Sequence, residues 1–203
     1  KLLQITLRNN FAPDATDLVQ ALAPIAADRW VPRGLLTIYH ENFNDHGLAR
    51  LSTVPSAEVL GVLSLYNTQV SDDGLVALRG FPRLQGLNLL GAKTFTGAGL
   101  THLKSLIDLT ALKIEKSLLT SARLSALTDL PLRTLHIHHN PAVDDAAIEP
   151  LSRLTSLTIL DVSGTALTAE GSKRLAAALP GCNITTPQGN IPGTLPLEVA
   201  KPM

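Results

Sequence analysis

Residues 60–78 read LGVLSLYNTQVSDDGLVAL, and the same order of residue types returns along most of the chain. Two apolar residues one position apart come first, followed by a polar bend, a small or acidic cluster, and apolar residues three positions apart. Further copies occupy residues 34–51, 84–103, 109–127, 132–151 and 157–175. Measured between the second apolar residues of successive pairs, the steps from Leu7 onward are 31, 27, 24, 25, 23 and 25 residues. This period indicates one structural unit stacked many times.

Each part of the repeat predicts a structural element. The alternating start favours a strand whose two apolar side chains face inward. The next cluster supplies capping oxygens for a helical turn, as at residues 71–74 and 168–171. Stacking therefore predicts an α/β solenoid with a parallel sheet on its inner curve and short helices outside. The strand pairs are Ile5/Leu7, Leu36/Ile38, Leu63/Leu65, Leu87/Leu89, Leu112/Ile114, Leu135/Ile137 and Leu160/Val162, and the helical pairs are Leu75/Leu78, Leu100/Leu103, Leu124/Leu127 and Ile148/Leu151.

The two ends of the chain differ from the repeats. Residues 12–30 predict a longer, cap-like helix that Pro24 interrupts. Residues 175–185 are typical of a truncated last repeat, with Cys182 and Ile184 as its apolar pair. From residue 186 the repeat stops, and four prolines predict an extended tail or linker. We therefore expect one repeat domain of about seven repeats over residues 1–185, and a tail over residues 186–203.

Segments such as VSDDGLVAL (70–78) and LTAEGSKRL (167–175) resemble bacterial leucine-rich-repeat proteins of the cysteine-containing and ribonuclease-inhibitor-like types. The resemblance covers roughly residues 3–185, although the cysteine that usually follows the strand is missing. It implies a right-handed horseshoe with a concave parallel sheet, and a scaffold that recognises other proteins. Related repeats also occur in effector proteins that pathogens inject into host cells, some of which recruit ubiquitin-ligase machinery. No F-box-like segment is evident in this chain.

Composition narrows the function classes. The charges balance, with 17 basic and 17 acidic residues and no basic run, so nucleic-acid binding is not expected. Polar residues interrupt each apolar stretch before the roughly 20 residues of a membrane span, so no membrane partner is expected. The single cysteine, Cys182, predicts a small core residue and no internal disulfide, which favours the cytoplasm of the source cell or of a host. Without a phosphate loop or a nucleophile–base motif, neither cofactor nor enzymatic activity is expected.

Residues that flank the inward pairs predict the binding surface, because side chains alternate along a strand. Both tyrosines of the protein, Tyr39 and Tyr66, fall in one outward column, followed by Leu90. Tyrosines are enriched at interface hot spots, so we predict an anchor patch there for a protein or peptide partner. The alternative is that stacking between the tyrosines only stabilises the sheet. The two columns are Thr37, Ser64, Asn88, Lys113, His136 and Asp161, and Arg8, Tyr39, Tyr66, Leu90, Glu115, His138 and Ser163.

A second cluster lies in the same columns. The sequence HIHHN places His136 and His138 on one face, with Asp161 expected beside the first and Glu115 beside the second. Two imidazoles and a carboxylate suit zinc. They equally suit ordinary surface ion pairs, or a polar rim whose contacts depend on histidine protonation. We favour the rim, which includes Lys113, Glu115, His136, His138 and Asp161, over a metal site.

The sequence therefore predicts a protein-interaction module that binds on its concave face. An alternative is the substrate-recognition domain of a larger effector or ligase-type protein whose catalytic domain lies elsewhere. A third hypothesis is self-association through an uncovered end of the solenoid. The sequence leaves the identity of the partner and the oligomeric state open.

Overall fold

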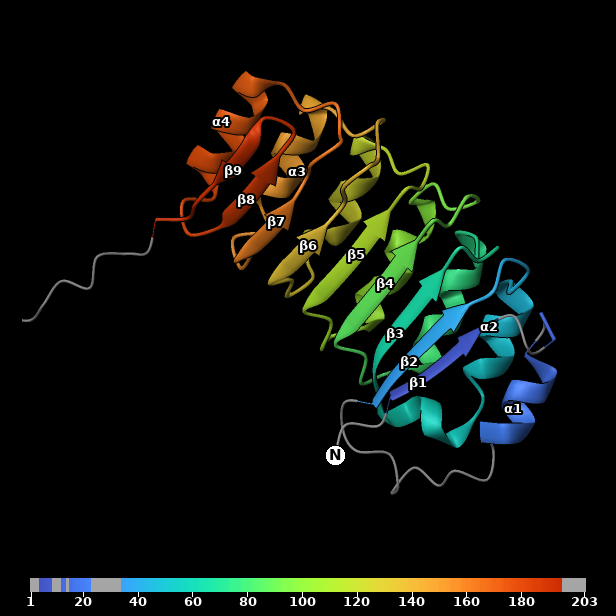
Figure 1. Ribbon diagram of the computed structural model, residues 1–203. Coiled ribbons are helices and arrows are strands. Elements are labelled where there is room, and N and C mark those ends of the chain that lie inside the picture. The colour runs from blue at the N-terminus through green and yellow to red at the C-terminus, as the bar shows by residue number, and fades with distance from the viewer. Residues whose placement is uncertain (1–3, 9–11, 14, 23–33, 195–203) are drawn as a thin grey trace, which may run out of the picture.

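The computed structural model describes residues 4–8, 12–13, 15–22 and 34–194. Within these residues nine strands form one sheet in the order of the sequence, and Figure 1 shows them side by side along the molecule. All neighbours from β1 to β8 are parallel, and β9 returns antiparallel to β8. The strands are β1 (Gln4–Arg8), β2 (Gly34–Tyr39), β3 (Leu60–Tyr66), β4 (Gly86–Leu90), β5 (Ala111–Glu115), β6 (Thr134–His136), β7 (Ile159–Asp161), β8 (Asn183–Thr186) and β9 (Gly189–Ile191).

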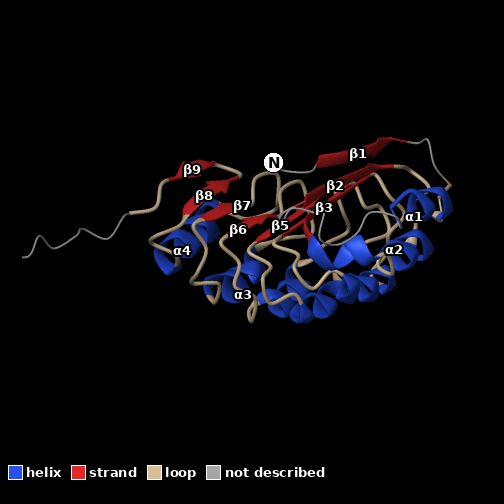
Figure 2. Ribbon diagram, turned by 90° about the horizontal axis from the view of Figure 1, so that it is seen from below, coloured by secondary structure: helices blue, strands red, loops and turns tan. Residues whose placement is uncertain are grey.

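Short helices cover the other side of the sheet. Figure 2 shows the sheet on the inner side of the curve and the helices along the outer side. No described helix is both long and apolar enough to cross a lipid bilayer. The helices are α1 (Thr16–Leu22), α2 (Asp45–Leu51), α3 (Ile148–Ser152), α4 (Ala169–Ala178) and the 3-10 helices η2 (Pro55–Val59), η3 (Asp73–Gly80), η4 (Ala98–Ser105), η5 (Ser121–Leu127) and η6 (Asp145–Ala147). The predicted α/β solenoid is confirmed.

The core lies between the sheet and these helices. The second apolar residues of the predicted pairs, from Leu7 to Ile114, pair with one another strand by strand. From the second repeat onward both members of each pair are buried. The predicted helical pairs are buried too, at no more than 5% exposure. Since burying one leucine contributes about 1.5–3 kcal/mol, these two facing rows supply most of the stabilisation of the stack.

Each of two aspartates accepts hydrogen bonds from the following repeat, and these bonds fix the spacing of the helices. Asp45 accepts from the amide and the hydroxyl of Ser71, at 2.7 and 2.6 Å. Asp145 accepts from the same two groups of Thr168, at 2.9 and 2.6 Å. A Cβ at Gly74 would lie 2.1 Å from Asp45 Oδ1, so only glycine permits this approach. The acidic clusters therefore join neighbouring repeats, besides opening helices.

The C-terminal end differs from the sequence-based expectation. Ile184 pairs with Leu160, so it takes the first position of the apolar pair, and the buried Thr186 follows as the second. Cys182, expected to belong to that pair, precedes the strand and is buried. The expected boundary at residue 185 falls inside β8, and part of the expected tail, β9, pairs with it. Residues 195–203 of that tail lie outside the described residues.

At the N-terminal end only part of the expected helix can be compared. Helix α1 covers Thr16–Leu22, within the predicted range of residues 12–30. Pro24, where we expect an interruption, lies outside the described residues. The helix is followed in space by α2, and both lie on the convex side with the other helices (Figure 1).

Candidate functional site on the sheet face

The first outward column predicted from the sequence is present, and the second is present from Arg8 to Glu115, whereas its predicted last members, His138 and Ser163, lie beyond the ends of β6 and β7. Thr37, Ser64, Asn88, Lys113, His136 and Asp161 pair with one another in that order. Arg8, Tyr39, Tyr66, Leu90 and Glu115 form the second column in the same way. The structure thus brings the candidate residues onto one face, on the concave side. Their role in binding stays a prediction.

The tyrosines form the centre of an aromatic stack at the β1–β3 end. The rings of Tyr39 and Tyr66 are 4.3 Å apart between centroids and inclined by 19°. The guanidinium of Arg8 lies 4.7 Å from the centroid of Tyr39, on the β1 side, as a cation–π contact. Burial raises the pKa of Tyr66, and the neighbouring Tyr39 raises it further, so its hydroxyl stays protonated at neutral pH. Both rings are half-buried, and they remain partly accessible to a partner.

The outward surface also has an apolar column that the sequence prediction did not include. It lies on the other side of the first column, and its strand partners run through Leu35, Val62, Gly86, Ala111, Thr134 and Ile159. Leu35 and Val62 are half-buried, whereas Ile159 is 44% exposed. Each residue lies two positions before a member of the first column, so the alternation rule already identified them. The column is apolar from Leu35 to Ala111, and its two ends, Gln4 and Asn183, are polar.

Two members of the predicted surface contribute little to it. Thr37 and Ser64 are outward in register but buried, with 7% and 3% of their surface exposed. The Ser64 hydroxyl accepts a 2.7 Å hydrogen bond from the Asn88 side chain. These short side chains lie between the tyrosine column and the apolar column, where larger neighbours cover them. The accessible surface near β2 and β3 is therefore formed mainly by the tyrosines.

The histidine–acid cluster is assembled as predicted at β5–β7. His138 Nε2 lies 2.9 Å from Glu115 Oε2, and His138 Nδ1 lies 3.5 Å from Asp161 Oδ2. His136 Nδ1 is 3.8 Å from the same Asp161 oxygen. Burial lowers the pKa of His136, and so does Lys113 beside it, against the opposing attraction of Asp161. Burial and Lys113 thus favour the neutral form of His136, and the cluster is not a simple row of charged pairs.

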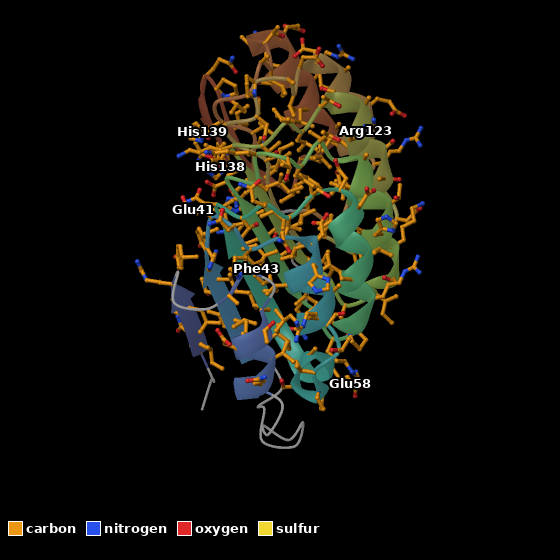
Figure 3. All side chains as sticks on the ribbon, turned by 90° about the vertical axis from the view of Figure 1, so that its right-hand side faces the viewer. Glu41, Phe43, Glu58, Arg123, His138 and His139 are labelled. Carbon is orange, nitrogen blue, oxygen red and sulfur yellow. The ribbon has the colours of Figure 1, made fainter. Side chains whose placement is uncertain are left out.

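Figure 3 places this cluster relative to the rest of the molecule. His138 lies on the sheet side, whereas Arg123 of η5 points outward from the helices on the opposite side. Phe43 lies between, in the interior, where it is fully buried. Glu41, which follows β2, is on the same side as His138. The candidate surface and the convex surface are thus well separated, which provides matched control positions.

A polar hollow adjoins the end of the tyrosine column. It has a volume of about 380 Å³ and includes Asn67 and Thr68, which directly follow Tyr66. The hydroxyl of Thr68 is buried and has no hydrogen-bond partner among the described residues. The remaining lining residues are Glu41, Asn42, Gln69, Gly91 and Lys93.

Other reactive residues have structural roles. His40 Nδ1 accepts a 3.1 Å hydrogen bond from the Asn42 amide, so this buried ring closes the bend after β2. Asp144 accepts a 2.7 Å hydrogen bond from the Ser121 hydroxyl of the preceding repeat. Burial raises the pKa of the Cys182 thiol to about 11, which keeps it protonated and unreactive at neutral pH. The single cysteine is a core residue, as the sequence predicts.

The comparisons with known proteins agree with this architecture. Residues 153–176 match the family model described as a Leucine Rich repeat. The chain is similar to the solved internalin C2 of Listeria monocytogenes, with a TM-score of 0.60 and 20% identity over 90% of this chain and 69% of that one. It is also similar to the internalin inlF of that species, with a TM-score of 0.54 and 20% identity over 80% and 49% of the two chains. No curated protein matches the sequence.

The repeat period and the sheet show a leucine-rich-repeat fold, and residues 153–176 match the pattern of one such repeat. The identities to the internalins are low, so the likeness concerns the fold alone. Leucine-rich-repeat proteins generally act in protein–protein interaction and present an extended concave surface. The ribonuclease-inhibitor-like subtype and an effector role stay predictions.

Proposed function

We propose that this protein binds a protein or peptide partner on the outward face of its sheet, with Tyr39, Tyr66 and Leu90 as the anchor. The observation that carries the proposal is the stacked tyrosine pair, which is held rigidly and yet half-exposed on the concave side. Rigid aromatic side chains lose little conformational entropy on binding and contribute both apolar area and a hydroxyl group.

The surroundings of the anchor are suited to recognition. Apolar Leu35 and Val62 extend it on one side, and the polar hollow beyond Tyr66 adds hydrogen-bonding groups on the other. Lys113, Glu115, His136, His138 and Asp161 follow along the sheet as a half-exposed charged rim. An apolar anchor with a charged rim is the usual organisation of a specific protein interface. Binding rather than catalysis is the function this open face supports.

The stack also stabilises the sheet, and this alternative can be separated from binding. A structural role alone predicts that replacing both tyrosines lowers the melting temperature and leaves affinity for a partner unchanged. A binding role predicts the loss of affinity in a protein that remains folded. The experiment is affinity capture from lysates of the source organism and of candidate hosts, with mass spectrometry.

Three baits are compared: the intact protein, Tyr39→Ala/Tyr66→Ala, and the convex control Arg123→Ala. We expect a partner that the intact protein and the control retain and that the double variant loses. Each tyrosine should contribute about 2 kcal/mol of binding free energy, which is roughly 30-fold in Kd. Equal retention by all three baits in proteins with the same melting behaviour would contradict the anchor.

The same surface would serve equally as the recognition domain of a larger protein. This chain spans 69% and 49% of the lengths of the two internalins. In that case the captured partner would be the substrate of an activity located outside these repeats. Chemical modification of the partner by the longer protein, and not by the repeats alone, would distinguish the two.

A further inference from the structure

The histidine–acid cluster contains an unusual buried atom. His138 Nδ1 is buried and has no hydrogen-bond partner among the described residues. The opposite nitrogen of the ring, Nε2, lies 2.9 Å from Glu115 Oε2, at hydrogen-bond distance. In a neutral imidazole one nitrogen donates and the other carries a lone pair. With its proton on Nε2, beside the Glu115 carboxylate, the neutral ring carries its lone pair on Nδ1.

Two further donor atoms face the same point. Asp161 Oδ1 accepts hydrogen bonds from the amide and the hydroxyl of Ser163, at 2.9 and 2.7 Å, which fixes the carboxylate. Its other oxygen, Oδ2, lies 3.5 Å from His138 Nδ1 and 3.8 Å from His136 Nδ1. These separations exceed a good hydrogen bond, and they leave electron-rich atoms opposite one another.

The spacing of the three atoms agrees with the size of a metal ion. One ligand atom from each of His136, His138 and Asp161 lies within 4.8 Å of the others. Four ligands at the usual zinc distances of about 2.0–2.1 Å are separated from one another by about 3.4 Å in a tetrahedron. Small rotations of the two rings would bring the three atoms to that spacing.

We propose that His136, His138 and Asp161 bind a Zn²⁺ ion on the concave face, with Glu115 orienting His138 from behind. Two imidazoles and one carboxylate form a ligand set typical of zinc sites that keep the fourth position open. A carboxylate that accepts from the remote nitrogen of a ligating histidine is the usual outer partner in such sites. The fourth position faces solvent on the binding surface, where water or a donor atom of a partner would complete it.

A positive charge, that of Lys113, lies next to the proposed zinc ligands. Lys113 lies next to His136 in the first column, and its positive charge repels a cation. The carboxylates of Glu115 and Asp161 offset it. We therefore expect Lys113→Met to bind zinc more tightly than the natural protein, whereas removal of a ligand weakens binding.

The test is isothermal titration of untagged full-length protein with ZnCl₂, with CaCl₂ as the hard-cation control. We expect one zinc ion per chain, no comparable calcium binding and a higher melting temperature with zinc. His138→Ala and Asp161→Asn should abolish the binding, and Glu115→Gln should weaken it by 10–100-fold, on the order typical of outer-sphere partners. His46→Ala, an exposed histidine of α2, is the matched control and should bind as the natural protein does.

Each variant is first checked for an unchanged circular dichroism spectrum and cooperative melting without metal. Asp161→Asn keeps the size of the side chain and its acceptor for Ser163, so it supports a conclusion even where His138→Ala is less stable. The absence of one-to-one zinc binding would overturn the proposal and leave the cluster as surface ion pairs. So would equal zinc binding by Asp161→Asn and His46→Ala, because the ion would then bind elsewhere.

Discussion

The two faces of the sheet follow opposite rules although they belong to the same strands. On the inward face the repeats from β2 to β7 use aliphatic residues, and both members of each pair from Leu36/Ile38 to Leu160/Val162 are buried. On the outward face the residue type varies from repeat to repeat, from arginine through two tyrosines and leucine to glutamate and histidine. The inward face is constrained by packing against the helices, and the outward face is free to vary. The periodic positions therefore determine the architecture, and we expect the positions that break the period to determine binding specificity.

The outward face is itself divided. At the β1–β3 end, Tyr39 stacks on Tyr66, and Arg8 makes a cation–π contact with Tyr39. At the β5–β7 end, His138 keeps a buried nitrogen unpartnered within the described part of the chain. The first end offers apolar area and the second offers lone pairs. The outward face thus carries an aromatic group and a histidine–acid group about three repeats apart.

The largest expected effect is the loss of stability when an inward side chain of the sheet is truncated, compared with the truncation of an outward one. Leu112→Ala removes a fully buried inward side chain, and we expect a loss of about 2–5 kcal/mol in the free energy of unfolding. Lys113→Ala, the next residue and outward, should change it by less than about 0.5 kcal/mol. Urea denaturation of both variants measures the difference. Similar losses for the two would contradict the division of the strand into a packing face and a binding face.

A smaller effect is expected at the bend that follows each strand. Asn140 is fully buried, and its side chain accepts from Ser117 and donates to the carbonyls of Ile114 and Ile137. Asn140→Ala leaves these groups unpaired and should cost about 2 kcal/mol or more. Thr68, at the same bend of an earlier repeat, has an unpartnered hydroxyl among the described residues, so Thr68→Val should be nearly neutral. Equal costs for the two, measured by denaturation, would show that the bend does not depend on its hydrogen bonds.

The smallest expected effect concerns pH. Partial burial opposes ionisation of Asp72, but hydrogen bonds from Gly99 and Thr96 outweigh it and lower its pKa. Because the pKa is lower in the folded chain, its stabilising effect is complete above the ordinary value of 3.8 and is lost as the pH falls through the folded value. We expect Asp72→Asn to be less stable than the natural protein at pH 6, with the difference shrinking towards pH 2. Exposed Asp73→Asn is the control, and a pH-independent difference for Asp72→Asn would contradict the account.

Much of the fold could be predicted because alternation along each strand assigns its residues to the inward and the outward face together. Alternation around Leu63 and Leu65 identified the inward pair, and the same rule placed Ser64 and Tyr66 outward, as the register confirms. The rule failed at the C-terminal end, where Cys182 and Ile184 look like a pair. There the last inward position is the polar Thr186, whose hydroxyl donates to Gly189 O at 2.8 Å in the turn to β9. A pattern of apolar residues alone does not reveal that a polar residue occupies an inward position.

The site could be predicted in position but not in detail. Strand register places Lys113, His136 and Asp161 side by side, and Glu115 and His138 each follow two residues beyond Lys113 and His136, where they meet. The close contact between His138 Nε2 and Glu115, and the burial of the second ring nitrogen, depend on side-chain conformations that no spacing specifies. Likewise, the burial of Thr37 depends on the size of its neighbours, which the alternation rule does not consider.

The central claim, that the outward face of the sheet binds a partner, is tested most directly by site-specific photocrosslinking. A benzophenone side chain is placed at Leu90 in the anchor or at Arg123 on the convex side, and each protein is irradiated with the captured partner. The account predicts a covalent adduct from position 90, little or none from position 123, and competition by excess unlabelled protein. An adduct from position 123 alone would place the interface on the helices and contradict the account.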